Sequence, residues 1–538
     1  MTVSRRYIFV LVAVGLLVFS SAHGTFKAPE SGWERAVVPT ENVAYTLQGF
    51  GLDVRDGLKA VAMRTLDRSD PRFEGKALYV TTGQEDGSWS EPVEIADSDH
   101  DIRFPPLVRI DSRNHIHVVW PERERDEDDP MDTEHWIRYA TYDGQAWTEP
   151  ITLFHRWTPF LPPTTLVIDA DDRLYFAVSA FAEDGGAARN YLVSSRDDDW
   201  TITEVADGTP DPGPPSGGIE ASLALSTSGT FHLVFTAGSG DSDNDIYHTY
   251  SLDEGETWAP ARRLHRSGAR FAHSPTLRAG PGDALHLAWR EAPARGALSD
   301  EAYHAYLSED RLLSEAARAA DGEDALRCQT SHLTADVPAQ FVDAPALSVA
   351  PSGQASILLM TLHDLSDGDG AIYHAYWDAQ WEDLVLLEDA PGGNATATAY
   401  HNGKVYAVYS RVVSPESEKR IVELAHQPVP FDRPVEPPVC RAPTGNAEAA
   451  SVTPYPNPTA GTLSVDVCPP EDAAFVDLRL YNALGQRVRT FLRQPVPDAA
   501  SCITVSDLDV GSLASGVYYL EAAANRTAFD TTPVVITR

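Results

Sequence analysis

The chain has 538 residues, which is long for a single hydrophobic core, so we expect several domains or a repeat array that adds small cores side by side. Its 79 acidic and 42 basic residues give a formal net charge of -37 at pH 7. This charge argues against nucleic acid and anionic membranes as partners, because both would be repelled. It identifies no substrate, because surface charge speaks to solubility more than to function.

The N-terminal segment has the features of a signal peptide. Arg5 and Arg6 precede an apolar run (residues 7–19), and small residues follow at the cleavage-type positions. This run is too short for a comfortable membrane span, and no later segment approaches the ~20 apolar residues that a span needs. We therefore expect residues 1–24 to be removed and the exported mature protein to carry no transmembrane span.

Tryptophans recur along the chain at a nearly constant spacing of about 56 residues, which is typical of a repeat architecture. The step from Trp258 to Trp381 spans two periods, and the missing outer strand is expected near residues 311–313. The repeated positions are Trp33, Trp89, Trp147, Trp200, Trp258 and Trp381. Together they predict seven outer strands.

Between successive tryptophans the chain repeats three short strands of alternating polarity. The second unit shows them best, at residues 106–111, 115–120 and 136–142, with Gly, Asn and Asp in the turns. Adding the tryptophan strand gives a four-stranded blade. The sequence therefore predicts an all-β fold, a seven-bladed β-propeller over residues 25–430, with six blades as the alternative if the weak unit at 273–320 is aberrant.

The two ends of the repeat region complement each other. The strand at Trp33 has no triple of strands before it, and the triple that ends near His426 has no tryptophan strand after it. Pairing the two would close the ring and remove the exposed sheet edges of an open array. We expect the N-terminal strand to complete the last blade.

One hairpin carries a complete motif of the type Ser-x-Asp-x-Gly-x-Thr-Trp. Its positions are Ser251, Asp253, Gly255, Thr257 and Trp258. The residues predict a hairpin lock, in which the Asp carboxylate accepts amide hydrogen bonds, Gly takes the left-handed conformation and Trp packs between sheets. The motif resembles the Asp-box or BNR repeats of sialidase-like propellers, and the resemblance implies a scaffold role rather than catalysis.

A Pro-rich linker (431–450) leads to a compact C-terminal segment, residues 451–538. Its landmarks are Tyr455 to Pro458, a Leu480 to Val488 stretch containing Gly485, and a last motif with Gly516, Tyr518 and Leu520. In this order they resemble the type A sorting domain of type IX secretion substrates. The resemblance implies a small immunoglobulin-like β-sandwich, the type IX secretion machinery as a partner, and a secreted or outer-membrane cell-surface location. An immunoglobulin-like accessory module is the alternative.

An exported compartment permits disulfides, and the chain has four cysteines. We prefer Cys468 with Cys502 inside the tail and Cys328 with Cys440 tying the linker to the propeller. Neither pairing follows from sequence alone, and the cysteines lack metal-ligand spacing.

In a propeller, the loops that enter the inner strands and those that join the second and third strands gather on one face. Residues there that occur in one blade only are candidates for function, whereas the repeated pairs Tyr247-His248, Tyr303-His304 and Tyr373-His374 are interpreted as packing. The catalytic candidates are Arg103, Arg270, Arg411, His273 and Glu220. The ligand-binding candidates are His155, Arg156, Trp157, Arg290 and Glu291.

Three functional hypotheses follow. A sialidase-like hydrolase needs three arginines, which Arg103, Arg270 and Arg411 could supply, and a tyrosine activated by a glutamate, but the spacing identifies no such pair. Propeller-type polysaccharide lyases are similar in repeat style, yet Pro121-Glu122 replaces the second histidine that this resemblance implies. We favour a propeller that binds an extracellular glycan or protein, with catalysis left open.

Three acidic loops are candidate calcium sites, at residues 126–129, 241–245 and 367–369. None has the spacing of an EF-hand, and solvated loops are the preferred interpretation. The sequence therefore predicts no firm cofactor or metal, and we expect a monomer.

Overall fold

The computed structural model describes most of residues 32–537. The expected signal peptide, the linker, and the candidates Arg103, Trp157 and Gly485 lie outside the described residues. The gaps are 41–45, 67–76, 98–99, 103, 125–133, 157–159, 162, 182–187, 197–198, 206–219, 239–243, 268–269, 294–299, 314–329, 335–340, 365–368, 379–380, 390–395, 415–418, 430–450, 460, 470–474, 483–486, 496–502 and 525–526.

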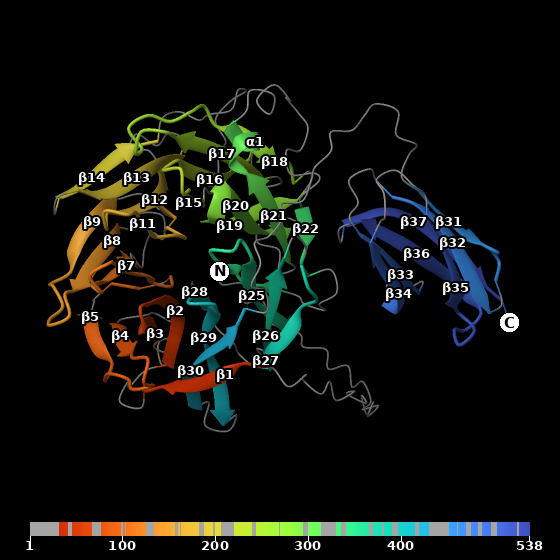
Figure 1. Cartoon of the computed structure of the whole chain (residues 1–538), viewed down its shortest axis with the longest axis horizontal. Helices are drawn as coiled ribbons and strands as arrows, with labels where there is room; N and C mark the ends of the chain where they lie inside the picture. Colours follow the sequence, from red (N-terminus) through yellow and green to blue (C-terminus); the bar gives the residue numbers. More distant parts are fainter. Residues whose placement is uncertain are drawn as a thin grey trace, which may run out of the picture. The chain divides into compact units, whose positions relative to one another are not determined.

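The described part of the repeat region forms seven antiparallel sheets, which we call blades 1 to 7 in the order of their inner strands (Figure 1). Five have four strands. Blades 3 and 6 have a fifth short strand, because two short strands instead of one pair with the long strand next to the inner edge. Blades 1 and 2 contain β2 (Thr46–Arg55), β3 (Leu58–Leu66), β4 (Ala77–Gly83), β5 (Val93–Asp97), β6 (Leu107–Ile110), β7 (Ile116–Arg123), β8 (His135–Tyr142) and β9 (Ile151–Arg156). Blades 3 and 4 contain β10 (Phe160–Leu161), β11 (Val167–Ile168), β12 (Leu174–Phe181), β13 (Ala188–Arg196), β14 (Asp199–Glu204), β15 (Ala221–Leu225), β16 (Phe231–Ala237), β17 (Asp245–Ser251) and β18 (Arg262–His265).

The remaining blades complete the β-propeller predicted from the sequence. Blades 5 and 6 contain β19 (Phe271–Ala279), β20 (Ala284–Ala292), β21 (Glu301–Ser308), β22 (Thr330–His332), β23 (Phe341–Val342), β24 (Ala346–Val349), β25 (Ala355–Asp364), β26 (Asp369–Trp377) and β27 (Val385–Asp389). Blade 7 contains β28 (Ala397–His401), β29 (Lys404–Ser414), β30 (Lys419–Pro428) and β1 (Glu34–Val38).

Blade 7 is closed by the N-terminal strand, as the sequence predicted. Strand β1 pairs antiparallel with β30, from Glu34 opposite His426 to Val38 opposite Val422. Val38 is fully buried, and Trp33 packs in the core that blades 6 and 7 share. The ring is therefore joined by hydrogen bonds between segments at opposite ends of the repeat region.

Blade 5 corrects one expectation. We predicted its outer strand near residues 311–313, but this segment belongs to the short helix α1 (Glu309–Leu313), and the outer strand is β22. Leu312 is buried in the core with Leu264 and Trp289, so the helix packs between blades 4 and 5. The unit on which the six-bladed alternative depended still forms a four-stranded sheet.

The complete Asp-box motif is a hairpin lock between β17 and β18. The Asp253 carboxylate accepts hydrogen bonds from Thr257 N at 2.8 Å and from the hydroxyls of Ser251 and Thr257 at 2.8 and 2.5 Å. These hydrogen bonds, led by the Thr257 hydroxyl, lower the pKa of Asp253. Gly255 has φ 88°, which favours glycine, and Trp258 Nε1 donates to its carbonyl. The motif is scaffold.

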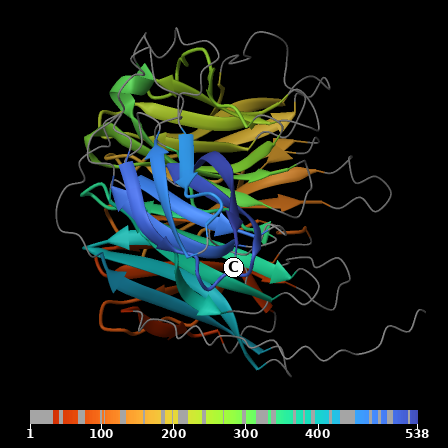
Figure 2. The same cartoon turned by 90° about the vertical axis from the view of Figure 1, so that its right-hand side faces the viewer.

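The C-terminal segment forms two further sheets with one shared core. One sheet contains β31 (Ser451–Tyr455), β32 (Thr462–Cys468) and β35 (Ile503–Asp509). The other contains β34 (Arg487–Pro495), β33 (Phe475–Tyr481), β36 (Gly516–Ala524) and β37 (Thr527–Ile536), drawn in blue in Figure 2.

Residues of the sequence motifs in this segment pack and form hydrogen bonds within its two-sheet β-sandwich. Tyr518 and Leu520 point into the core, and the Tyr518 hydroxyl donates to the Ala514 carbonyl at 2.9 Å. The Asn457 side chain brackets β37, donating to Pro533 O and accepting from Val535 N, both at 2.8 Å. Cys468 is disulfide-bonded. Its proposed partner Cys502, like Cys328 and Cys440, lies outside the described residues.

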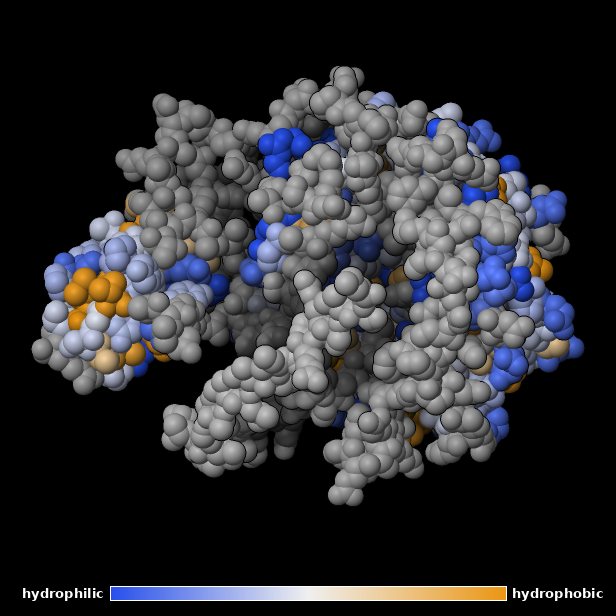
Figure 3. All heavy atoms as spheres, turned by 180° about the vertical axis from the view of Figure 1, so that it is seen from behind, coloured by the Kyte–Doolittle hydropathy of each residue, from blue (hydrophilic) through white to orange (hydrophobic). Residues whose placement is uncertain are grey.

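Two short helices occur in the described residues, α1 and the 3-10 turn η1 (Pro281–Asp283). Within those residues no helix combines the length and apolar character that crossing a bilayer requires. The described side chains visible in Figure 3 are mostly hydrophilic, with hydrophobic ones in small groups.

Candidate functional site

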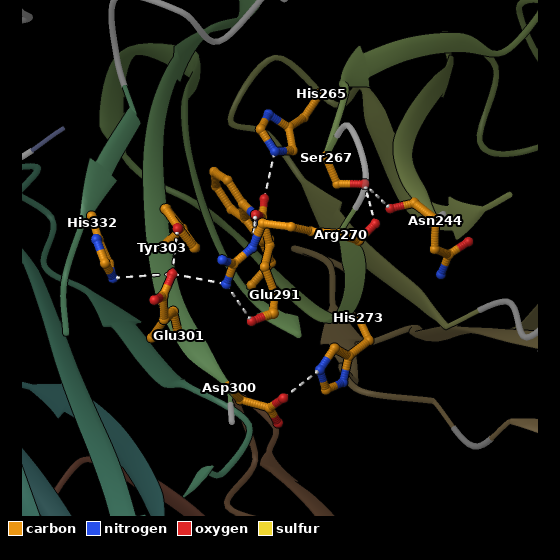
Figure 4. Close-up of polar contacts among 12 residues, drawn as sticks. Asn244, His265, Ser267, Arg270, His273, Glu291, Asp300, Glu301, Tyr303 and His332 are labelled. Atoms are coloured by element: carbon orange, nitrogen blue, oxygen red, sulfur yellow. Dashed lines mark hydrogen bonds and ion pairs between the residues drawn. The ribbon is translucent and has the colours of Figure 1, made fainter. Parts of the chain in front are cut away.

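Five of the ten candidate residues come together at the end of blade 5 where β19 begins and β20 ends, and Figure 4 shows Arg270, His273 and Glu291 among them. They are Glu220, Arg270, His273, Arg290 and Glu291. They form two neighbouring groups, one around Arg290 and one around Arg270, and the two differ in what they do.

The first group, which we call the blade 5 cluster, consists of Glu220, His273, Ser274, Arg290 and Asp300. The Arg290 guanidinium donates to Ser274 Oγ at 2.8 Å and to the Val342 carbonyl of blade 6 at 2.6 Å, and its Nη1 lies 3.2 Å from Asp300 Oδ2. The Glu220 carboxylate, which precedes the inner strand of blade 4, accepts the Ser274 amide. The cluster therefore joins three blades.

The pair of His273 and Asp300 contains two polar atoms that form no hydrogen bond within the described residues. His273 Nε2 lies 3.5 Å from Asp300 Oδ1, and neither atom has a hydrogen-bond partner among the described residues, although both are buried. Asp300 is only 4% exposed. A buried carboxylate oxygen without a hydrogen-bond donor is costly, so this pair is a candidate for binding a polar group from outside the protein.

Ser274 has an unusual backbone. Its φ is 52°, in the left-handed region that a non-glycine residue rarely adopts, and the pairing of β19 with β20 shifts register between His273 and Thr276. The bulge turns the chain so that the Ser274 amide meets Glu220 while its hydroxyl meets Arg290. Strain of this kind collects at functional sites and is held by the surrounding contacts.

The second group, the Arg270 network, lies toward the outer strands. Arg270 contacts Glu301 Oε2 at 2.8 Å and Glu291 Oε2 at 3.2 Å. The Tyr303 hydroxyl donates to the same Glu301 oxygen at 2.8 Å, so a tyrosine–glutamate pair that the sequence spacing did not identify is present. Figure 4 shows Arg270, Tyr303 and His332 converging on this carboxylate, with His332 Nε2 3.6 Å from Glu301 Oε2.

The electrostatics of Tyr303 oppose a role as nucleophile. Burial first, and then the negative charges of Glu291 and Glu301, raise the pKa of Tyr303 above its ordinary value. Its ring is stacked on Trp289 and on His332, with centroids 5.6 and 4.7 Å away. A nucleophilic tyrosine needs the opposite shift and an open approach to its hydroxyl.

Blade 2 repeats part of the Arg270 network, which marks that part as packing. Trp289 Nε1 donates to Glu291 Oε1 at 3.0 Å, and Trp120 Nε1 donates to Glu122 Oε1 at 2.8 Å. His100 lies 3.5 Å from Glu122, in the role that Arg270 has at Glu291. Carboxylates at this position thus anchor the entry strand in both blades.

The other described candidates lie in different blades. His155 ends blade 2, stacked on Trp136 at 5.5 Å and 3.5 Å from Glu134, and the Arg156 guanidinium lies over the Phe154 ring at 4.7 Å. Arg411 of blade 7 donates to Glu423 at 2.9 Å. In the described residues these side chains make no contact with the blade 5 cluster.

Calcium has no described site. Among the residues that the structure describes, no group of three or more His, Cys, Asp or Glu side chains is arranged to hold a metal ion. The three acidic loops lie largely outside those residues.

Comparison with known proteins settles the nature of the C-terminal segment. Residues 453–537 match the family model described as the secretion system C-terminal sorting domain. The chain ends in a sorting domain. A protein with this domain is exported to the cell surface or beyond by type IX secretion, and the sorting domain implies interaction with that machinery. No curated protein matches the chain.

Several solved structures are similar to the chain at low identity. A protein of unknown function from Dyadobacter fermentans has 13% identity and a TM-score of 0.41, and the match covers 74% of this chain and 100% of that one. An ulvan lyase bound to a glucuronate–rhamnose sulfate unit has 10% identity, a TM-score of 0.45, and coverage of 70% and 93%. The Trypanosoma rangeli sialidase in complex with sialic acid has 10% identity, a TM-score of 0.42, and coverage of 93% and 88%. No activity is transferred from these likenesses.

Sequence reasoning missed Ser274, Asp300 and Glu301. The signal for Glu301 was present, because Glu301 and Tyr303 are two apart on a strand and so share a face. Asp300 follows a segment outside the described residues, and Ser274 acquires its role only through the bulge. Neither position carries a signal in the local pattern.

Proposed function

We propose that this exported propeller binds an extracellular glycan at the blade 5 cluster. The observation that carries the proposal is the buried His273–Asp300 pair, whose facing atoms have no hydrogen-bond partner among the described residues. It lies beside Arg290, where side chains and a backbone carbonyl from blades 4, 5 and 6 meet.

The chemistry of the cluster suits sugar hydroxyls. A hydroxyl both donates and accepts a hydrogen bond, and the cluster offers a carboxylate oxygen as acceptor and an imidazole nitrogen that serves in either role. The Arg290 guanidinium is held by three contacts, so the groups around it are fixed before a ligand arrives. Loops that enter inner strands on a rigid scaffold are the usual place for such a site.

Binding is tested with the purified mature protein on a glycan array, followed by calorimetry on the best ligand. His273→Ala should weaken binding at least 10-fold, because it removes a partner at the centre of the cluster and corresponds to roughly 1.4 kcal/mol. His155→Ala is the matched control, since His155 also lies 3.5 Å from a carboxylate oxygen but in blade 2. Equal affinities of wild type and His273→Ala would overturn the proposal.

A second candidate is a sialidase-like hydrolase, favoured by one observation, the 2.8 Å hydrogen bond from Tyr303 to the Glu301 carboxylate that also binds Arg270. A fluorogenic sialoside and a panel of acidic polysaccharides test it, with fluorescence reporting hydrolysis and ultraviolet absorbance reporting unsaturated uronate from a lyase. The raised pKa of Tyr303 leads us to expect no hydrolysis. Hydrolysis that Tyr303→Phe abolishes would instead make the protein an enzyme.

A further inference from the structure

Three inner strands place a charged residue at one level of the ring. In each of these blades the inner strand is joined to the second strand by a tight turn, and the last paired residue before the turn closes it. The charged residue stands two positions before that closing residue, and it is Asp53, Arg109 or Arg278. Those closing pairs are Arg55 with Leu58, Asp111 with His115 and Gly280 with Ala284. The equivalent register puts the three charged residues in one layer around the axis.

The same rule gives the other four members of the layer, and none of them is charged. In these four blades the turn is closed by Asp169, Ser226, Ala350 and His401, and the layer position again lies two residues earlier. The four positions are Val167, Ala224, Ser348 and Ala399. The layer thus contains two guanidinium groups and one carboxylate, a local excess of positive charge in a chain whose net charge is -37.

The two arginines stand on inner strands from different parts of the ring. Strand β6 belongs to blade 2 and β19 to blade 5, with two blades between them on one side and three on the other. Burial first, and then the charge of Arg109, lowers the pKa of Arg278 to about 9, against the opposing effect of the Asp53 charge. Residues on such distant strands can act on each other in this way only through the middle of the ring.

Neither arginine has the partner that other arginines of the propeller have. Arg109 donates to the carbonyl of Val108 at 2.9 Å, and Arg278 donates to the carbonyl of Leu277 at 3.0 Å. Among the described residues, neither forms an ion pair with a carboxylate. The Asp53 carboxylate accepts the Ile110 amide at 2.8 Å, and its single negative charge acts on both arginines, so the layer keeps one uncompensated positive charge.

We propose that this layer binds a small inorganic anion, such as chloride or sulfate, between Arg109 and Arg278. Two partly buried like charges repel each other and are poorly solvated, and an anion between them offsets both costs. Guanidinium groups supply planar N–H donors that suit such an anion. The site lies on the inner strands, near the turns to the second strands, and is separate from the blade 5 cluster.

Bromide tests the position of the site directly. Crystals of the mature protein grown with sodium bromide should show an anomalous peak between the two guanidinium groups. A bromide map without a peak there would overturn the proposal. A peak without a saturable response in solution would mean binding at crystal concentration only, which also overturns it.

The solution test measures the melting temperature while chloride replaces gluconate at constant ionic strength. We expect a saturable rise of roughly 2–4 °C, and its loss in Arg278→Met. In gluconate, Arg278→Met should melt at or above the wild-type temperature, because the repulsion is gone. The control Arg173→Met changes an arginine that already pairs with Glu254 at 2.9 Å and should keep the response.

Arg109→Gln provides a second variant if Arg278→Met does not fold. It removes the other guanidinium and should also abolish the chloride response. A chloride response that persists in either folded variant would overturn the assignment to this layer.

Discussion

Blades 2 and 5 share a framework and differ at the position between its tryptophan and its glutamate. Each has a fully buried tryptophan on its second strand, Trp120 or Trp289, whose indole donates to a glutamate two residues later. The residue between tryptophan and glutamate is Pro121 in blade 2 and Arg290 in blade 5. Proline has no amide hydrogen and offers no side-chain polar group, whereas Arg290 binds three partners.

The comparison separates packing from function. What the two blades share, the indole, the carboxylate and a nitrogen-bearing side chain on the entry strand, anchors each sheet to its neighbour. What blade 5 has alone is Arg290, with His273 and Asp300 beside it, joined to blades 4 and 6 through Ser274 and Val342. The following predictions test this separation, beginning with the largest effect.

The largest effect concerns acid stability. His286 and His304 of blade 5 are buried, with Nδ1 and Nε2 3.1 Å apart, where blade 2 has His117 and Tyr139. Burial lowers the pKa of His286 from 6.5 to about 3. Because the unfolded chain therefore binds the proton first, this stability is complete above pH 6.5 and is lost as the pH falls toward 3.

At pH 4 the loss should reach about 3 kcal/mol for His286. Urea unfolding at pH 7.5 and pH 4 measures it. His286→Gln should flatten the pH dependence more than His117→Gln, since the carboxylate of Asp111 near His117 opposes the effect of burial on that pKa. Equal slopes for the two variants would contradict the comparison.

The shared carboxylates should be needed for stability in both blades. Glu291→Ala removes the partner of Arg270, His265 and Trp289, and Glu122→Ala removes that of Trp120. Each should lower the free energy of unfolding by about 2 kcal/mol, because buried donors lose a charged acceptor. Urea titrations measure both, and a cost confined to Glu291 would assign that residue to the functional site instead.

The smallest effect concerns the backbone at Ser274. Ser274→Gly relieves the left-handed strain, whereas Ser274→Ala keeps it, and both lose the hydroxyl that Arg290 binds. The glycine variant should be the more stable by about 1 kcal/mol. Thermal unfolding of the pair measures this, and a more stable alanine variant would show that the backbone there is not strained.

Much of the fold could be predicted because each repeat carries its own signal. The tryptophan spacing and the alternating strands located the blades, and the unmatched strand at Trp33 indicated the closure with β30. The outer strand of blade 5 was misplaced because its unit lacks a tryptophan and Leu312 fills the core from a helix instead. The site could be predicted only in part, since Asp300 and Ser274 acquire their roles from contacts between blades.

The closure of blade 7 also has a consequence for how the protein reaches its folded state. Glu34 pairs with His426, so nearly the whole repeat region must be synthesised and ordered before the last sheet is complete. Contacts between such distant residues are slow to form, because the loop they close is costly in entropy. Until then β30 keeps an unpaired edge that other chains can bind. The final strand to join the ring is thus among the first to leave the ribosome, and ring closure sets the end of the period in which the exported chain is prone to aggregate.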